Sequence, residues 1–111
     1  MNNIKNDKYY ICKTIENINM IILYTKNKSY DDFVSDNVLV DATMFRLIQM
    51  VENINHISKE FKEMHSSIAW GEISGFRNGI VHQYGKTNYK IVYEIITHDI
   101  YNLVDEIKKA I

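Results

Sequence analysis

The chain contains no proline and only four glycines, and all four glycines lie between positions 71 and 85. Proline and glycine are the residues that most often end or interrupt helices. Their absence from most of the chain therefore favours long helices, and no convincing strand, repeat or low-complexity tail accompanies them.

Metal-binding and disulfide-forming patterns are absent as well. The single cysteine, Cys12, excludes an internal disulfide and provides no cysteine framework for a metal. We expect Cys12 to be a small core residue of the first helix. His65, His82 and His98 do not have metal-ligand spacing on one helix, so neither a metal nor another cofactor is predicted. We expect His56, His65 and His98 to lie at the surface.

Long apolar runs and an excess of one charge are also missing. No run approaches the ~18 residues that a membrane span requires. The N-terminus lacks the apolar stretch of a signal peptide, so the cytoplasm is the expected localisation and no membrane partner is predicted. The net charge of −1 argues against a general nucleic-acid coat. It leaves room for an RNA-processing enzyme whose positive charge is confined to one cleft.

The composition is that of an ordinary globular domain. The 111 residues are 46% hydrophobic and 24% charged, which predicts one domain over residues 1–111 with a single core. Ser29 followed by Asp32 is typical of a helix N-terminus. Apolar spacing predicts helices over 7–26, 30–63 with an interruption near 35–37, 66–83 and 89–109.

These helices predict the fold class. Consecutive amphipathic helices joined by short loops pack antiparallel, so we expect an all-α, antiparallel four-helix up-down bundle. Met50 and Met64 are expected to fill the core. The other expected core positions are Ile11, Ile15, Ile18, Ile22, Met44, Leu47, Ile48, Val51, Ile54, Ser58, Phe61, Val92, Ile96, Leu103, Ile107 and Ala110.

Residues 70–85 hold the only tryptophan, every glycine and one of the two arginines. Read as a helix, the segment has an apolar stripe from which Arg77 projects. Burying an arginine alone is costly, so Arg77 must be paired or lie at an interface or site. The opposite face carries Gly71, Gly75 and Gly79, joined by Asn78 and His82. This glycine stripe indicates close helix packing, within the subunit or across a dimer, more than ligand contact.

The polar residues of this segment suit chemistry on a phosphate. Arginine binds phosphate through two parallel hydrogen bonds, and histidine gives and takes protons near neutral pH. Asn78 and His82 share a helix face, whereas Arg77 and His82 lie about 140° apart. A second copy of the helix, brought close across the glycine stripe, would set two His82 and two Arg77 residues around one cleft. Such a pair could supply both an acid and a base.

The pattern Trp70-x2-Ile73-x-Gly75-x-Arg77-Asn78-x-Ile80-x-His82-x-Tyr84 closely resembles the signature of HEPN-domain ribonuclease toxins of the HepT type. The resemblance extends over essentially the whole chain and includes Ala42, Arg46 and Glu52 on the second predicted helix. Two departures are Gln83, where an acidic residue is common, and the missing proline before the tryptophan.

The resemblance implies a homodimer with the motif at the dimer interface. It also implies metal-independent cleavage of RNA, in which the 2′-hydroxyl attacks the adjacent phosphate and leaves a 2′,3′-cyclic phosphate. His82 would move protons, Arg77 would hold the phosphate, and Asn78 would orient the histidine or the RNA. The implied partner is a minimal nucleotidyltransferase antitoxin that adds adenylate to Tyr84.

Other interpretations stay open at this point. Arg77 could be structural and pair with an acid such as Glu52, and His82 could be a satisfied interface histidine. Tyr84 could be a core or capping aromatic. A rival function is a non-catalytic subunit whose Arg77/His82 cleft holds a nucleotide or RNA for a partner nucleotidyltransferase. A third is an interaction module that dimerises through the glycine face.

Overall fold

A computed structural model describes residues 3–81 and 88–111 of the chain, and all regular structure in these ranges is helical. This confirms the all-α prediction for the part of the chain that is described. The elements are α1 (Asn3–Thr25), α2 (Tyr30–Val34), α3 (Asn37–Asn55), α4 (Lys59–Met64), α5 (Trp70–Val81), α6 (Tyr89–Glu94), the π-helical segment η1 (Ile95–Asp99) and α7 (Ile100–Ala110).

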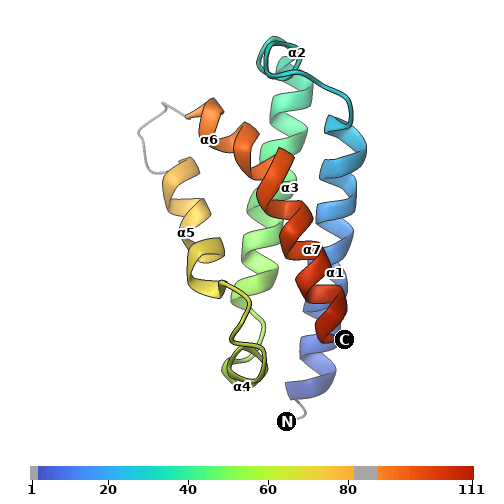
Figure 1. The fold of residues 1–111 in the computed structure, drawn as a ribbon, viewed down its shortest axis with the longest axis vertical. Helices are drawn as coiled ribbons and strands as arrows, with labels where there is room; N and C mark the ends of the chain where they lie inside the picture. The colour runs from blue at the N-terminus through green and yellow to red at the C-terminus, as the bar shows by residue number, and fades with distance from the viewer. Residues whose placement is uncertain (1–2, 82–87) are drawn as a thin grey trace.

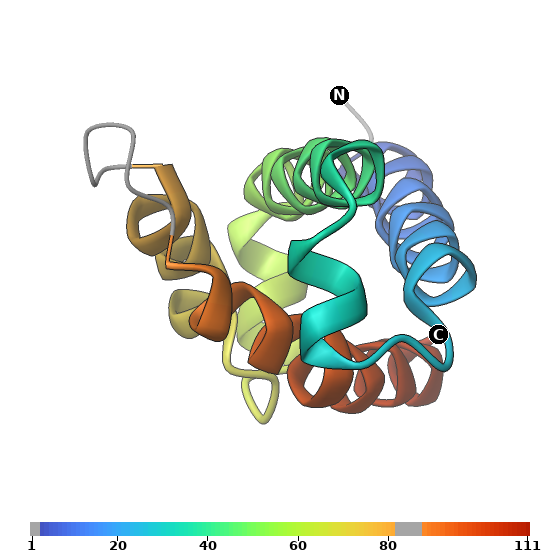
Figure 2. The same cartoon turned by 90° about the horizontal axis from the view of Figure 1, so that it is seen from above.

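The long elements alternate in direction along the long axis of the molecule (Figure 1). Helices α1 and α3 lie side by side over most of their length, α5 packs against α3, and α7 packs against α1. Seen from above, α5 occupies one edge of this arrangement, and α2 lies over one end of it (Figure 2). None of the helices in the described ranges is long and apolar enough to cross a membrane.

The core lies between these helices and is built from their apolar faces. Each fully buried aliphatic side chain contributes about 1.5–3 kcal/mol of transfer free energy. The fully buried apolar residues include Ile18, Ile21, Phe33, Leu47, Met50, Val51, Ile54, Val92, Ile96, Ile100 and Ile107. Six predicted core positions are only partly buried, namely Ile15, Ile22, Met44, Ile48, Phe61 and Ala110.

Two predicted core residues are wrong. Cys12 is exposed, because the buried face of α1 runs through Ile11, Thr14 and Ile18 and leaves position 12 on the outer side. Met64 is 78% exposed, because it ends the short helix α4, of which no residue is buried.

The predicted start of the second helix and its interruption are both confirmed. The side chain of Ser29 accepts a hydrogen bond from the backbone N–H of Asp32, and the Asp32 side chain accepts one from the N–H of Ser29. This reciprocal cap starts α2. The chain then restarts at Asp36, whose carboxylate accepts from the N–H of Leu39 and caps α3.

A second interruption, at residues 56–58, was not predicted. Ser58 was expected to be a buried helical residue, but it is the N-cap of α4, and its hydroxyl accepts a hydrogen bond from the N–H of Phe61. The buried carboxylate of Asp7 accepts two hydrogen bonds from Ser58, at 2.7 Å from its backbone nitrogen and 2.6 Å from its hydroxyl. The break therefore depends on a partner 51 residues away in the sequence.

Helix α5 begins at Trp70 and not at Ser66 as predicted. Residues 65–69 form a turn before it, and the indole N–H of Trp70 donates to the backbone carbonyl of His65 at 3.1 Å. Contrary to the prediction of a surface position, His65 is half-buried, and its ring lies 4.5 Å from that of Phe61.

The last predicted helix contains a π-helical segment, η1. Seven residues make close to two turns of an α-helix, so Asp99 would share the face of the fully buried Val92. The wider π turn accommodates one extra residue. Ile100 therefore takes the buried position, and Asp99 is exposed at the end of the segment.

Candidate functional site

Helix α5 carries the first part of the sequence motif, from Trp70 to Ile80, and is held to the rest of the molecule by its apolar face. Ile73 is buried, and Trp70 and Phe76 are partly buried against the core. The ring of Trp70 also meets that of Phe61 edge to face, with centroids 6.3 Å apart. These contacts hold the first half of α5 against α3 and the turn before it.

The described glycines of α5 lie on its exposed side. A Cβ atom added to Gly71 or Gly75 would meet no atom within 4 Å in the part of the chain that the structure describes. The described part of the subunit therefore provides no close packing for these two glycines, and packing across a dimer stays a prediction. Ile73 takes the inner face of the helix, which turns Gly71 and Gly75 outward.

The structure places the predicted site residues only in part. Arg77 and Asn78 lie on α5, at neighbouring positions of the helix backbone, and their side chains are outside what the structure describes. His82 and Tyr84 lie outside the described residues altogether. The roles assigned to these four residues remain predictions.

The proposed structural partner of Arg77 lies on the neighbouring helix. Glu52 is half-buried on α3, the helix against which α5 packs. A pairing between Arg77 and Glu52 remains a prediction, because the Arg77 side chain is not described.

The other arginine has a defined partner that the sequence did not reveal. The guanidinium of Arg46 donates to the side-chain oxygen of Asn17 at 3.2 Å. The amide of Asn17 donates in turn to the carbonyl of Lys13 at 3.0 Å. Arg46 therefore links α3 to α1, which is a structural contact within the subunit.

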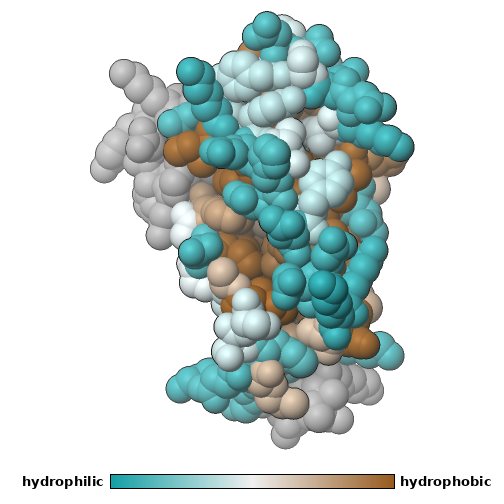
Figure 3. Space-filling view, in the orientation of Figure 1, coloured by the Kyte–Doolittle hydropathy of each residue, from teal (hydrophilic) through white to brown (hydrophobic). Residues whose placement is uncertain are grey.

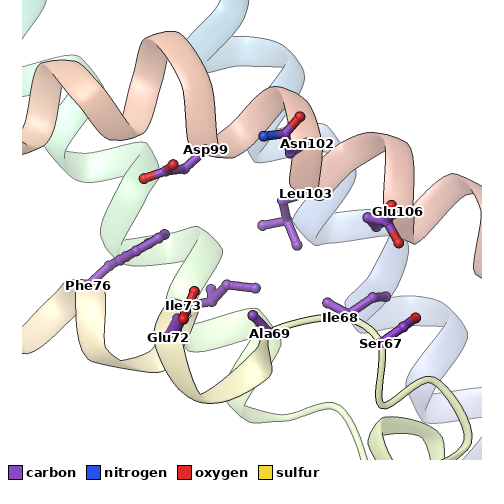
Figure 4. A pocket seen from close by; sticks show the side chains of 10 residues that line it. All are labelled: Ser67, Ile68, Ala69, Glu72, Ile73, Phe76, Asp99, Asn102, Leu103 and Glu106. Atoms are coloured by element: carbon purple, nitrogen blue, oxygen red, sulfur yellow. The ribbon is translucent and has the colours of Figure 1, made fainter.

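A cleft of about 280 Å³ lies between the first half of α5 and the segment η1–α7 (Figure 4). It was not predicted, because its two walls come from helices far apart in the sequence. Its lining is apolar below and acidic at the rim, and consists of Ser67, Ile68, Ala69, Glu72, Ile73, Phe76, Asp99, Asn102, Leu103 and Glu106.

The electrostatics of this cleft are unfavourable to anions. Asp99 is exposed, but partial desolvation of its carboxyl raises the pKa, and the neighbouring carboxylate of Glu94 raises it further. His98 lowers this pKa, and Glu72 raises it again from the opposite wall. The rim of the cleft is thus a region of negative potential.

A second, shallower groove lies beside α4 and the start of α5. Lys59, Lys62, Trp70 and Gly71 are among the residues that line it. Burial lowers the pKa of the Lys62 ammonium, and the carboxylate of Asp7 opposes this shift. The described residues contain no group of three or more His, Cys, Asp or Glu side chains placed to hold a metal ion.

Comparison with known proteins gives consistent family matches. The chain is 33% identical over 107 residues to a Caldanaerobacter subterraneus subsp. tengcongensis protein named "Putative RNase TTE0752", and the match covers 96% of each chain. It is 27% identical over 109 residues to a Thermococcus cleftensis protein named "Probable ribonuclease HepT", with 95% of this chain and 96% of the relative covered. No solved structure matches the chain significantly.

A family-level comparison agrees with these relatives. The family described as Ribonuclease HepT-like matches residues 14–110, which include every described helix except the first turns of α1. The all-helical fold is compatible with that assignment. The chain therefore belongs to the HepT-like ribonuclease family.

Proposed function

We propose that the protein is a metal-independent endoribonuclease and the toxin of a toxin–antitoxin pair. The observation that carries this proposal is the family match over residues 14–110 together with the motif Arg77-x4-His82-x-Tyr84. The position of Arg77 and Asn78 next to each other on the backbone of α5 is compatible with it. We take the chain to be one domain over residues 1–111, a four-helix HEPN bundle.

The proposed reaction is an internal transesterification of RNA. The 2′-oxygen forms a bond to the adjacent phosphorus while the bond from phosphorus to the 5′-oxygen breaks. One His82 takes the proton of the 2′-hydroxyl, and a protonated His82 gives a proton to the leaving 5′-oxygen. The products are a 2′,3′-cyclic phosphate and a 5′-hydroxyl.

Arg77 and Asn78 assist this reaction without transferring protons. The guanidinium of Arg77 donates two parallel hydrogen bonds to the phosphate and stabilises the charge that develops on its oxygens. Asn78 holds the histidine or the RNA in orientation. A half-buried carboxylate such as Glu52 would keep Arg77 in its working rotamer.

The active form that we propose is a homodimer that meets near α5. Glycine in a helix interior costs about 1 kcal/mol relative to alanine. Gly71 and Gly75 face outward and make no close contact within the described part of the subunit, so packing against a second copy would account for them. Such a dimer would bring a His82 and an Arg77 from each subunit to one site.

We propose that a minimal nucleotidyltransferase antitoxin controls the enzyme by adding adenylate to Tyr84. The adduct would occupy the site and carry a negative charge, which repels the phosphates of RNA. The near-neutral net charge of the chain supports an enzyme that acts at a local site and has little general affinity for RNA.

The test is an RNA cleavage assay in the presence of EDTA, on protein shown by intact mass to carry no adenylate. Cleavage products are then treated with a phosphatase before and after mild acid opening of cyclic phosphates. We expect cleavage with cyclic-phosphate ends. Cleavage that stops on chelation would refute metal independence, and binding of RNA without cleavage would favour the non-catalytic subunit.

A further inference from the structure

The cleft between α5 and η1–α7 has a floor that is unusually apolar for an open surface feature. Ile68, Ile73 and Leu103 form this floor and are each about 95% buried, and Phe76 closes one side. The space-filling view shows the groove as a hydrophobic furrow between α5 and α7, bordered by hydrophilic surface (Figure 3). Apolar furrows rimmed by polar residues are typical of interaction surfaces.

The rim of the cleft carries acids from both walls. Glu72 projects from α5, and Asp99 and Glu106 project from the opposite wall with Asn102 between them (Figure 4). None of the described residues that line the cleft is basic. The rim carboxylates therefore have no cationic partner among the described lining residues.

The π-helical segment helps to create this arrangement. Without the extra residue of η1, Asp99 would fall on the buried face that Val92 occupies. With it, Asp99 stands at the cleft, and Leu103 reaches the floor one turn further along. π turns within helices occur frequently at functional positions.

We propose that this cleft binds a basic, amphipathic segment of a partner protein. A large apolar side chain of the segment would enter the furrow, and flanking lysines or arginines would meet Glu72, Asp99 and Glu106. Charge complementarity selects this occupant, because the negative rim repels RNA and any acidic peptide. The proposal does not depend on the ribonuclease activity.

The binding surface is connected to the motif through α5. Phe76 lines the cleft, and the next residue of the same helix is Arg77. A polypeptide seated in the cleft would therefore touch the element that carries the first motif residues.

The proposal is tested by fluorescence anisotropy with a labelled amphipathic peptide of leucine and lysine at helical spacing. A second peptide with glutamate in place of each lysine controls for apolar binding alone. We expect only the lysine peptide to bind, and binding to weaken as salt screens the charges. Equal binding of both peptides, or no binding of either, would overturn the proposal.

Matched variants locate the binding site. Glu72→Lys with Glu106→Lys reverses the charge of the rim, and we expect a loss of affinity of about tenfold or more. Glu106→Lys alone is compared with Asp105→Lys, which makes the same single charge reversal at an exposed α7 position outside the cleft, and we expect Asp105→Lys to change the affinity less than about twofold. If the two changes lower the peptide affinity equally, the peptide is attracted by the overall charge of the protein and not by the cleft, which would contradict the proposal.

A neutral variant and two further measurements complete the test. Ala69→Trp fills the mouth of the furrow without changing charge, so it should also abolish binding if the anchor enters there. Circular dichroism confirms that each variant is folded. Self-association in sedimentation that Ala69→Trp abolishes would identify a second copy as the occupant, and RNA binding lost in that variant would identify RNA. Either result would overturn the proposal that the cleft binds a segment of a partner protein.

Discussion

Asp7 and Ser58 join the start of α1 to the start of α4 through two hydrogen bonds of 2.7 and 2.6 Å. Asp7 is 4% exposed as a residue, so both bonds are largely shielded from water. A buried acceptor that is charged makes stronger hydrogen bonds than a neutral one. This pair therefore fixes the break between α3 and α4, and with it the turn that leads into α5.

We expect Asp7→Ala to lower the free energy of unfolding by about 1–3 kcal/mol, because a buried N–H and a hydroxyl lose their acceptor. The measurement is urea unfolding followed by circular dichroism. Combined with Ser58→Ala in a double-mutant cycle, the pair should show a coupling energy of about 0.5–3 kcal/mol. Asp105→Ala, at an exposed position of α7, is the control; additive effects of Asp7→Ala and Ser58→Ala would contradict the assignment.

The stability of the protein should depend on the ionisation of Asp99. Its pKa is raised in the folded protein above the ordinary value of 3.8, chiefly by partial desolvation of the carboxyl and then by the charge of Glu94. The folded state thus binds the Asp99 proton more tightly than the unfolded state does. The stability that this protonation provides is lost as the pH rises through the raised pKa. We expect Asp99→Asn to be more stable than wild type at neutral pH, with the difference vanishing below about pH 4.

The measurement is the urea midpoint of both proteins across this pH range. Asn102→Ala, in the same cleft but without an ionisable group, should shift the midpoint by a constant amount. If the difference in urea midpoint between Asp99→Asn and wild type does not change with pH, the pKa of Asp99 is the same in the folded and unfolded states, which would contradict the prediction.

The exposed glycines of α5 separate monomer stability from dimer formation. Gly75→Ala should stabilise the isolated subunit by about 1 kcal/mol, since alanine is the better helix former and the added Cβ meets no described atom. The same change should weaken dimerisation and RNA cleavage if a second α5 packs on this face. Analytical ultracentrifugation and thermal unfolding report the two effects; an intact dimer with full activity would place the interface elsewhere.

Tyr84→Phe tests the proposed control by adenylation. The substitution removes only the phenolic hydroxyl group, to which the adenylate would be attached. The variant should therefore cleave RNA at a rate close to wild type and accept no adenylate from a partner nucleotidyltransferase. Intact mass spectrometry after incubation with that enzyme and ATP measures the adduct. If Tyr84→Phe gains the same mass as wild type, the modification lies on another residue.

The sequence predicted local features well where a single segment determines them. The cap at Ser29, the interruption near residues 35–37 and the core residues Leu47 and Ile54 follow from residue type and helical spacing alone. The family, too, follows from a contiguous motif over residues 70–84, and the family match over residues 14–110 confirms it.

Features that depend on distant residues were missed. The break after α3 involves a hydrogen bond from Ser58 to Asp7, which lies 51 residues earlier in the sequence. Apolar spacing is a local signal, so it predicted one continuous helix through this break. The π turn at η1 depends on which face of the last helix meets the core, and the acidic cleft requires two helices to be brought together. The roles of Arg77, Asn78, His82 and Tyr84 remain predictions.

The central claim is that His82 transfers protons in RNA cleavage, and its most direct test compares wild type with His82→Ala in EDTA. We expect the variant to lose about 10²–10⁴-fold in cleavage rate, the usual contribution of a general acid or base. RNA binding, measured on the same preparations, should be retained. Cleavage by His82→Ala at the wild-type rate would contradict the account, and a parallel loss of RNA affinity would make His82 a binding residue.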